Sequence, residues 1–127
     1  MPSSSPADPT LREQALSALC LKDPAAKADA AHALWRRWIG LSDEGSQAQA
    51  LAAEAALAQP ADTALPGRPD RPALVPPMTV PHRSPFTPEG LGALLHAITH
   101  IEFNAINLAL DAVWRFPAMP VAFYVDW

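Results

Sequence analysis

The sequence predicts an all-α protein in which a proline-rich strap separates N-terminal helices from one long helix. Two observations lead to this class. Apolar residues recur at alternating spacings of four and three over 91–116, which is typical of one helix face. Nine of the 15 prolines fall within 60–88, where no regular helix or central strand can form. The predicted regions are a disordered N-terminus (1–9), a helical region (10–59), an extended strap (60–87) and the start of an incomplete helical bundle (88–127).

The helical region begins at Thr10, where Thr10 and Glu13 have the spacing of a capping box. This predicts a first helix over about 10–22. A second helix follows from Asp23 as N-cap and Pro24 at its first position, where the missing N–H costs nothing.

The second helix is expected to end at about Ile39, with Gly40 as its stop signal. A run rich in Ala, Gln and Glu predicts a third helix over about 43–58.

The strap is predicted to be extended and to pack on the fold. A flexible linker is the alternative, but the segment is too apolar for one. The apolar residues concerned are Leu74, Val75, Met78, Val80 and Phe86. Three strap arginines are candidate anchors to acidic groups of the fold: Arg68, Arg71 and Arg83.

The long helix is predicted over 88–115. Thr87 caps it, Pro88 takes the first position, and Glu89 suits the positive end of the helix dipole. The helix must end before Pro117, and Pro120 is expected to open a further short helix.

Two sides of the long helix differ in character at about 100° per residue. A polar stripe occupies one sector: His96, His100, Asn104, Asn107, Asp111 and Arg115. A seam typical of a helical bundle occupies the other: Leu91, Leu95, Ile98, Glu102, Ala105, Ala109, Ala112 and Phe116.

Glu102 is the one carboxylate in this seam, between Ile98 and Ala105. A carboxylate inside a bundle is costly unless it is paired, protonated or bound to a cation. Three alternatives stay open. Glu102 forms an ion pair with a basic residue of another helix, or reaches water at the edge of the seam, or binds a metal such as iron or manganese.

The histidines do not complete a metal site with Glu102. His96 and His100 share a helix face, but they project about 120° and 160° away from Glu102. They are expected to be polar-stripe residues that hydrogen-bond to the strap. Cys20, His32 and His82 have no ligand or catalytic partner at readable spacing, and no phosphate loop or nucleophile elbow is found.

Composition excludes several classes. A net charge of −4 argues against non-specific binding to nucleic acid or to an anionic membrane. No stretch is long and apolar enough to span a bilayer, and no signal peptide is read. A single cysteine fits a reducing cytoplasm, which is the expected location.

Several motifs resemble the bacterial ferritin-like family catalogued as domain of unknown function 455. They are PGRPDRPALVPP in the strap, HIE at 100–102, FYVDW at 123–127 and, less specifically, ALSALCLKDPAAKADAAHALWRRW near the N-terminus. The resemblance covers roughly residues 11–127. It implies a ferritin-like four-helix bundle with a di-iron or di-manganese carboxylate centre, and distant similarity to tRNA-hydroxylating di-iron enzymes.

By this resemblance Glu102 matches the first-helix carboxylate ligand, and His100 matches the histidine of the HIE motif. Because helical geometry points His100 away from Glu102, it is expected to support the site without binding the metal, or to be structural. Family members are about twice this length, and the resemblance places their Glu-x-x-His ligands after the FYVDW segment. The chain is therefore expected to be an N-terminal fragment that lacks a stable di-metal centre by itself.

Two functions follow as hypotheses. The first is part of a ferritin-like oxidoreductase whose substrate is unknown. The second is a non-catalytic helical protein that self-associates or has a partner covering its exposed seam. RNA binding is disfavoured, because there is no array of basic and aromatic residues.

Overall fold

A computed structural model describes residues 8–41, 45, 47 and 64–127. Within these residues the regular structure is helical and contains no strand, so the all-α prediction is confirmed. The predicted disorder over 1–9 and the predicted helix over 43–58 fall mainly outside the described residues. The elements are α1 (Leu11–Cys20), α2 (Pro24–Ile39), a 3-10 turn η1 (Pro77–Thr79), α4 (Pro88–Arg115) and α5 (Val121–Asp126).

Helix α1 begins with the predicted capping box. The Glu13 amide donates to Thr10 Oγ1 over 3.3 Å, and the Thr10 amide donates to Glu13 Oε2 over 2.8 Å. The helix ends at Cys20, two residues before the predicted end at 22. Its buried side chains, Leu19 and Ala15 among them, form the centre of the core.

Helix α2 has the predicted bounds. Asp23 caps it by accepting from the Ala26 amide over 2.8 Å, and Pro24 is its first residue. Gly40 follows its last residue but has φ −76°, in the right-handed region. The predicted stop is thus in the right place, although Gly40 does not use the left-handed conformation that normally favours glycine there.

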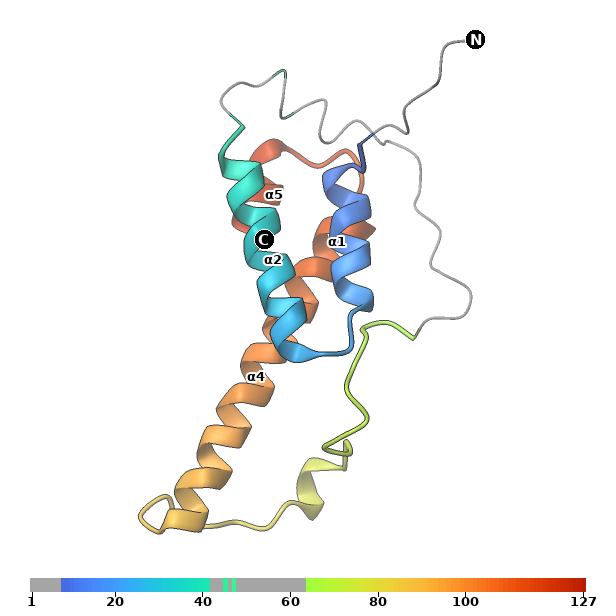
Figure 1. The fold of residues 1–127 in the computed structure, drawn as a ribbon. Coiled ribbons are helices and arrows are strands. Elements are labelled where there is room, and N and C mark those ends of the chain that lie inside the picture. The colour runs from blue at the N-terminus through green and yellow to red at the C-terminus, as the bar shows by residue number, and fades with distance from the viewer. Residues whose placement is uncertain (1–7, 42–44, 46, 48–63) are drawn as a thin grey trace.

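The core lies where α1, α2 and the C-terminal half of α4 meet. Figure 1 shows α1 and α2 side by side, with α4 crossing behind them and its N-terminal half projecting beyond both helices. The strap leads away from α1 and α2 to the far end of this projecting half, where α4 begins. The core residues are Leu11, Ala15, Ala18, Leu19, Trp38, Leu110, Val113, Trp114 and Tyr124.

Helix α4 has the predicted bounds and the predicted Thr87 cap, which accepts from the Gly90 amide over 3.0 Å. Its seam is uncovered, as the hypothesis of an exposed seam expects, and the side that packs on the other helices was not singled out from the sequence. The first five seam positions, from Leu91 to Ala105, are exposed, with Leu95 57 % exposed. The side of α4 that packs on α1 and α2 carries Phe103, Leu110 and Trp114 instead. Helix α4 therefore has two apolar sides. One packs on α1 and α2, and the other, the seam, is uncovered over its first five positions.

Helix α5 is fixed to the end of α4 by a buried tyrosine. Tyr124 is 4 % exposed and its hydroxyl donates to the Phe116 carbonyl over 2.6 Å. The same oxygen accepts from the Met119 amide over 3.2 Å. Both polar functions of the phenol are therefore satisfied next to the core, as burial of a tyrosine requires.

The described part of the strap is extended apart from η1, but it packs only at its start. Gly67 is buried, and its amide donates to the Leu19 carbonyl over 2.8 Å. The prediction that the apolar strap residues pack on the fold is wrong for this chain, because Met78 and Phe86 are each 95 % exposed and Leu74, Val75 and Val80 are also exposed.

Candidate functional site

Glu102 lies on the uncovered side of α4, with exposed Ile98 and Ala105 on either side. Among the described residues it takes part in no hydrogen bond or ion pair. In the same residues no three His, Cys, Asp or Glu side chains come close enough together to hold a metal ion. A lone carboxylate does not hold a di-metal centre, so the described donor set does not fit one by itself.

The two histidines of the polar stripe lie on the strap side of α4, away from Glu102. His100 and His96 line a cavity together with strap residues. His100 Nε2 is 3.1 Å from Asn104 Nδ2, and Asn104 Oδ1 accepts from Arg68 Nη2 over 2.8 Å. Among the described residues neither histidine hydrogen-bonds to the strap directly; Asn104, another residue of the polar stripe, makes the contact with Arg68. Arg68 anchors the strap to an amide, not to the acidic group that was expected.

The Asn104 amide has a defined orientation because a guanidinium can only donate. Asn104 Oδ1 must face Arg68, which leaves Nδ2 to donate to His100 Nε2. In this arrangement the His100 proton therefore sits on Nδ1. The structure does not bring His100 and Glu102 together.

A buried lysine links three segments of the chain. Lys27 of α2 is 0 % exposed, and its Nζ donates to the Gly67 carbonyl and to Asn107 Oδ1, each over 2.6 Å. The ammonium also lies 4.9 Å from the centroid of the Phe103 ring. Asn107 belongs to the predicted polar stripe, and it is buried at this junction.

Burial lowers the pKa of Lys27 to about 8, and the neighbouring Arg68 charge acts in the same direction while Cys20 opposes it. Burial also raises the pKa of the Cys20 thiol, with the Lys27 charge acting against it. Sequence reasoning missed this cluster because a lysine in the first turns of a helix normally faces water. The glycine of the PGRP motif was the available signal, since a glycine between prolines often marks close backbone approach.

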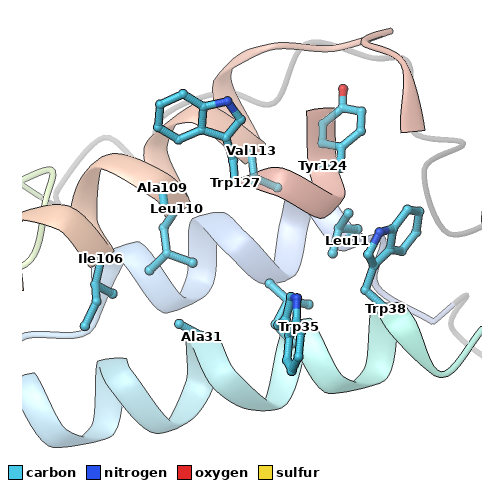
Figure 2. A pocket seen from close by; sticks show the side chains of 11 residues that line it. Leu11, Ala31, Trp35, Trp38, Ile106, Ala109, Leu110, Val113, Tyr124 and Trp127 are labelled. Carbon is cyan, nitrogen blue, oxygen red and sulfur yellow. The ribbon is translucent and has the colours of Figure 1, made fainter. Parts of the chain in front are cut away.

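An apolar cavity of about 220 Å³ lies between α2, α4 and α5 (Figure 2). Trp38 lines it and is 2 % exposed, and its Nε1 finds no hydrogen-bond partner. Ile106, Leu110, Tyr124 and Trp127 form other parts of the wall. This cavity holds no charged lining residue, so it offers packing space and no acid–base chemistry.

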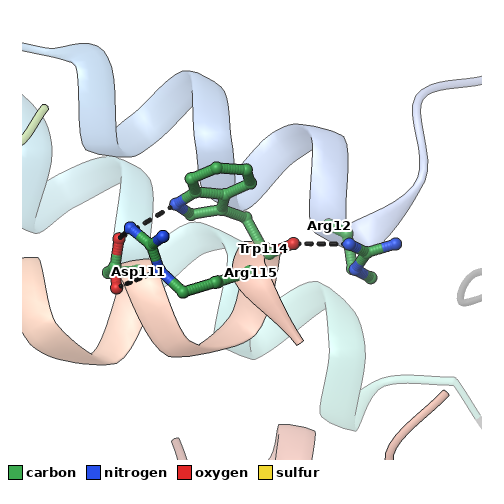
Figure 3. A network of polar contacts seen from close by, with 4 residues as sticks. All are labelled: Arg12, Asp111, Trp114 and Arg115. Carbon is green, nitrogen blue, oxygen red and sulfur yellow. Dashed lines mark hydrogen bonds and ion pairs between the residues drawn. The ribbon is translucent and has the colours of Figure 1, made fainter. Parts of the chain in front are cut away.

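A polar network secures the end of α4 to α1 (Figure 3). Buried Arg12 donates through Nη2 to the Trp114 carbonyl over 2.5 Å. On the solvent side, Arg115 pairs with Asp111 over 2.8 Å, and the Trp114 indole donates to the same carboxylate over 3.2 Å. The hydrogen bond from Arg115 holds the pKa of Asp111 below its usual value. This network helps to hold α4 against α1.

Comparison with known proteins identifies the family. The family of proteins of unknown function DUF455 matches residues 20–127. The chain belongs to the DUF455 family.

A further comparison gives a relative in Haemophilus influenzae (strain ATCC 51907 / DSM 11121 / KW20 / Rd), an uncharacterized protein. It is 67 % identical over 48 residues, which are 38 % of this chain and 17 % of that relative. The match thus spans less than a fifth of the relative's length. No solved structure matches the chain. In the described ranges, no helix has the length and apolar character needed to cross a membrane.

Proposed function

We propose that this DUF455 chain contributes its long helix, with Glu102 as one metal ligand, to a ferritin-like carboxylate centre of iron or manganese. The observation that carries the proposal is the position of Glu102 on the uncovered apolar side of α4. A carboxylate flanked by exposed Ile98 and Ala105 would be enclosed as soon as another helix covered that side. Enclosure would leave it in need of a cation.

The remaining ligands are proposed to come from outside the described residues, since these residues supply a single carboxylate at this position. The matched relative has several times the length of the matched segment, which leaves room for further helices in a longer protein. The complete protein is proposed to be an oxidoreductase.

A cytoplasmic location is part of the same proposal, and the single cysteine supports it. Iron and manganese carboxylate sites need no disulfide framework, so a reducing compartment suits this chemistry.

The test starts from the transcript. Sequencing beyond codon 127 in all three frames defines the longest translated product, and that product is purified and its iron and manganese are measured by mass spectrometry. Glu102→Ala is expected to lose at least about half of the bound metal, because removing one ligand weakens a shared site by about tenfold or more. Glu89→Ala is the matched control, an exposed glutamate at the start of the same helix.

Metal content unchanged in Glu102→Ala would refute the ligand role, as would a product that contains no metal at all. A gain in stability on Glu102→Leu with unchanged metal content would identify Glu102 as a structural acid.

A second function is proposed because a specific observation favours it: exposed large apolar residues lie on the side of α4 that carries Glu102 and on the face next to it. Leu91, Leu95 and Ile98 lie on the first, and Leu94, Ile101 and Leu108 lie on the second. A contiguous apolar surface of this kind is typical of an association site. In this alternative the chain is a non-catalytic helical protein that self-associates or binds a partner through α4.

A further inference from the structure

A second cavity lies between the strap and the projecting half of α4, on the side opposite the seam. Its volume is about 110 Å³, which is room for a small molecule and not merely for one water. Buried Phe103 forms its floor, and the strap forms one wall. The lining residues are Pro24, Arg68, Pro69, Pro72, Leu74, His96, Thr99, His100 and Phe103.

The titratable lining of this cavity is entirely basic. It consists of Arg68, His96 and His100, and no carboxylate among the described residues lines the cavity. The chain as a whole carries a net charge of −4, so the Arg68 guanidinium makes this cavity a site of positive charge on an acidic protein. Asp70 is exposed on the strap nearby but is not part of the wall.

Arg68 is held in position before any ligand arrives. Its Nη2 donates to Asn104 Oδ1 over 2.8 Å, and its guanidinium carbon lies 5.8 Å from the Phe103 ring centroid. The amide contact and the ring together restrict the side chain, so less rotamer entropy is lost on binding. The other N–H groups of the planar guanidinium remain for a ligand, and this fork matches a carboxylate in a bidentate manner.

The rest of the lining is apolar and selects among anions. Three prolines, Leu74 and Phe103 surround the basic groups. An inorganic phosphate would leave most of its oxygens against hydrocarbon, which is costly. A carboxylate with a short hydrocarbon body satisfies both parts of the wall.

We infer that the cavity between the strap and α4 binds a small organic carboxylate, with Arg68 as the main contact for the charge and His96 and His100 beside it. The hydrocarbon body lies over Phe103 and the strap prolines. This site is separate from the proposed metal ligand, because Glu102 projects from the other side of the helix. It also gives the PGRPDRP motif a role in forming the wall.

The test uses all 127 residues of the present chain, with butyrate as the probe. Titration is followed by NMR of the arginine Nε and histidine ring signals and by calorimetry. Saturable binding is expected with a Kd on the order of 1 mM, which suits so few ligand atoms. Butyramide has the same shape without the charge and is expected to bind at least about tenfold more weakly, and acetate and inorganic phosphate are also expected to bind more weakly than butyrate.

Substitutions of single residues test which side chains contact butyrate. Arg68→Gln is expected to weaken butyrate binding by at least about tenfold, because a charge-assisted bidentate contact is lost. Arg71→Gln, an exposed strap arginine outside the cavity, is the matched control and is expected to leave the Kd unchanged. His96→Gln touches no hydrogen bond of the fold, and it is expected to weaken binding by a smaller, roughly threefold factor.

Three results would overturn the inference. They are the absence of saturable shifts with butyrate, equal binding of butyramide, and equal weakening by the Arg68 and Arg71 variants. If Arg68→Gln does not fold, the His96 variant and the butyrate–butyramide comparison on the unmodified chain still decide the matter.

Discussion

Gly67 is the residue at which the strap approaches the helices most closely. A Cβ atom at this position would lie 2.3 Å from the Cys20 carbonyl oxygen and 2.6 Å from that of Leu21. Both neighbours are backbone atoms and cannot rotate away. Gly67→Ala is therefore expected to lower the free energy of unfolding by at least about 2 kcal/mol, measured by urea denaturation.

Gly92 provides the matched control, because an added Cβ there meets nothing within 4 Å. Gly92 lies within α4, where alanine is preferred to glycine by about 1 kcal/mol. Gly92→Ala is thus expected to be stabilising. A Gly67→Ala chain as stable as the unmodified one would mean that the strap does not dock on α1 in solution.

Lys27 predicts an unusual dependence of stability on alkaline pH. Its pKa is lowered from the ordinary 10.5 to about 8 in the folded chain. Between these values the unfolded chain binds more protons than the folded chain, so the free energy of unfolding should rise with pH. The buried charge destabilises the fold fully below about pH 8, and this cost is relieved by about pH 10.5. The full contribution is about 3 kcal/mol, at about 1.4 kcal/mol per pKa unit.

The measurement is urea denaturation at several pH values from 7 to 10.5, on the unmodified chain and on Lys27→Met. When both chains also carry Cys20→Ser, the difference between the two curves isolates Lys27, because the Lys27 charge otherwise acts on the Cys20 thiol. This matters because the raised pKa of Cys20 acts in the opposite direction, lowering stability as the unfolded thiol ionises. Parallel pH curves for the two proteins would show that Lys27 has an ordinary pKa and is solvated.

At the scale of the elements, what could be predicted from the sequence was local. The Thr10, Asp23 and Thr87 caps are confirmed because a capping side chain contacts amides within three residues of itself. The start of α4 at Pro88 and its end before Pro117 are also confirmed, because each bound depends on residues close to it in the chain. These signals need no knowledge of the rest of the fold.

The packing face of α4 could not be predicted because α4 has two apolar sides. Phe103, Leu110 and Trp114 define one, and the seam around Ile98 defines the other. Helical periodicity identifies apolar sides but does not say which neighbour covers which side. α1 and α2 cover the first, so the burial of Asn107 and its contact with Lys27 were not foreseen.

For the strap, too, the sequence predicts the local conformation but not which surface covers the side chains. Proline density correctly predicts an extended segment with little regular structure, since that depends on the proline ring itself. Whether apolar side chains of the strap are buried depends on which surface lies beside them. Only its start, at Gly67 and Arg68, meets the helices through hydrogen bonds. Met78 and Phe86 remain exposed beyond it.

At the scale of the whole molecule, the fold has a compact end and a projecting end. The core closes around α1, α2 and the C-terminal half of α4, whereas the N-terminal half of α4 extends beyond them (Figure 1). The seam on this projecting half is exposed along several helical turns. Burying an apolar side of this kind gains roughly 25 cal/mol per Å², so an uncovered seam favours association.

The chain alone is therefore expected to self-associate in a way that depends on its seam. Sedimentation equilibrium should show species larger than the 13.6 kDa chain at micromolar concentration. Leu95→Glu places a charge in the exposed seam and should shift the chain toward the monomer, by about tenfold or more in the dissociation constant, because a charge would have to be desolvated in the contact.

His96→Glu is the matched control. His96 is also exposed on the projecting half of α4, but it lies on the strap side, about 120° around the helix from Glu102. It should leave association unchanged. Equal effects of the two substitutions would place the contact elsewhere, and a strictly monomeric unmodified chain would mean that its own surface tolerates the open seam. A strictly monomeric chain would favour the metal-ligand proposal over self-association. A further segment of a longer protein would then be the remaining means of covering Glu102.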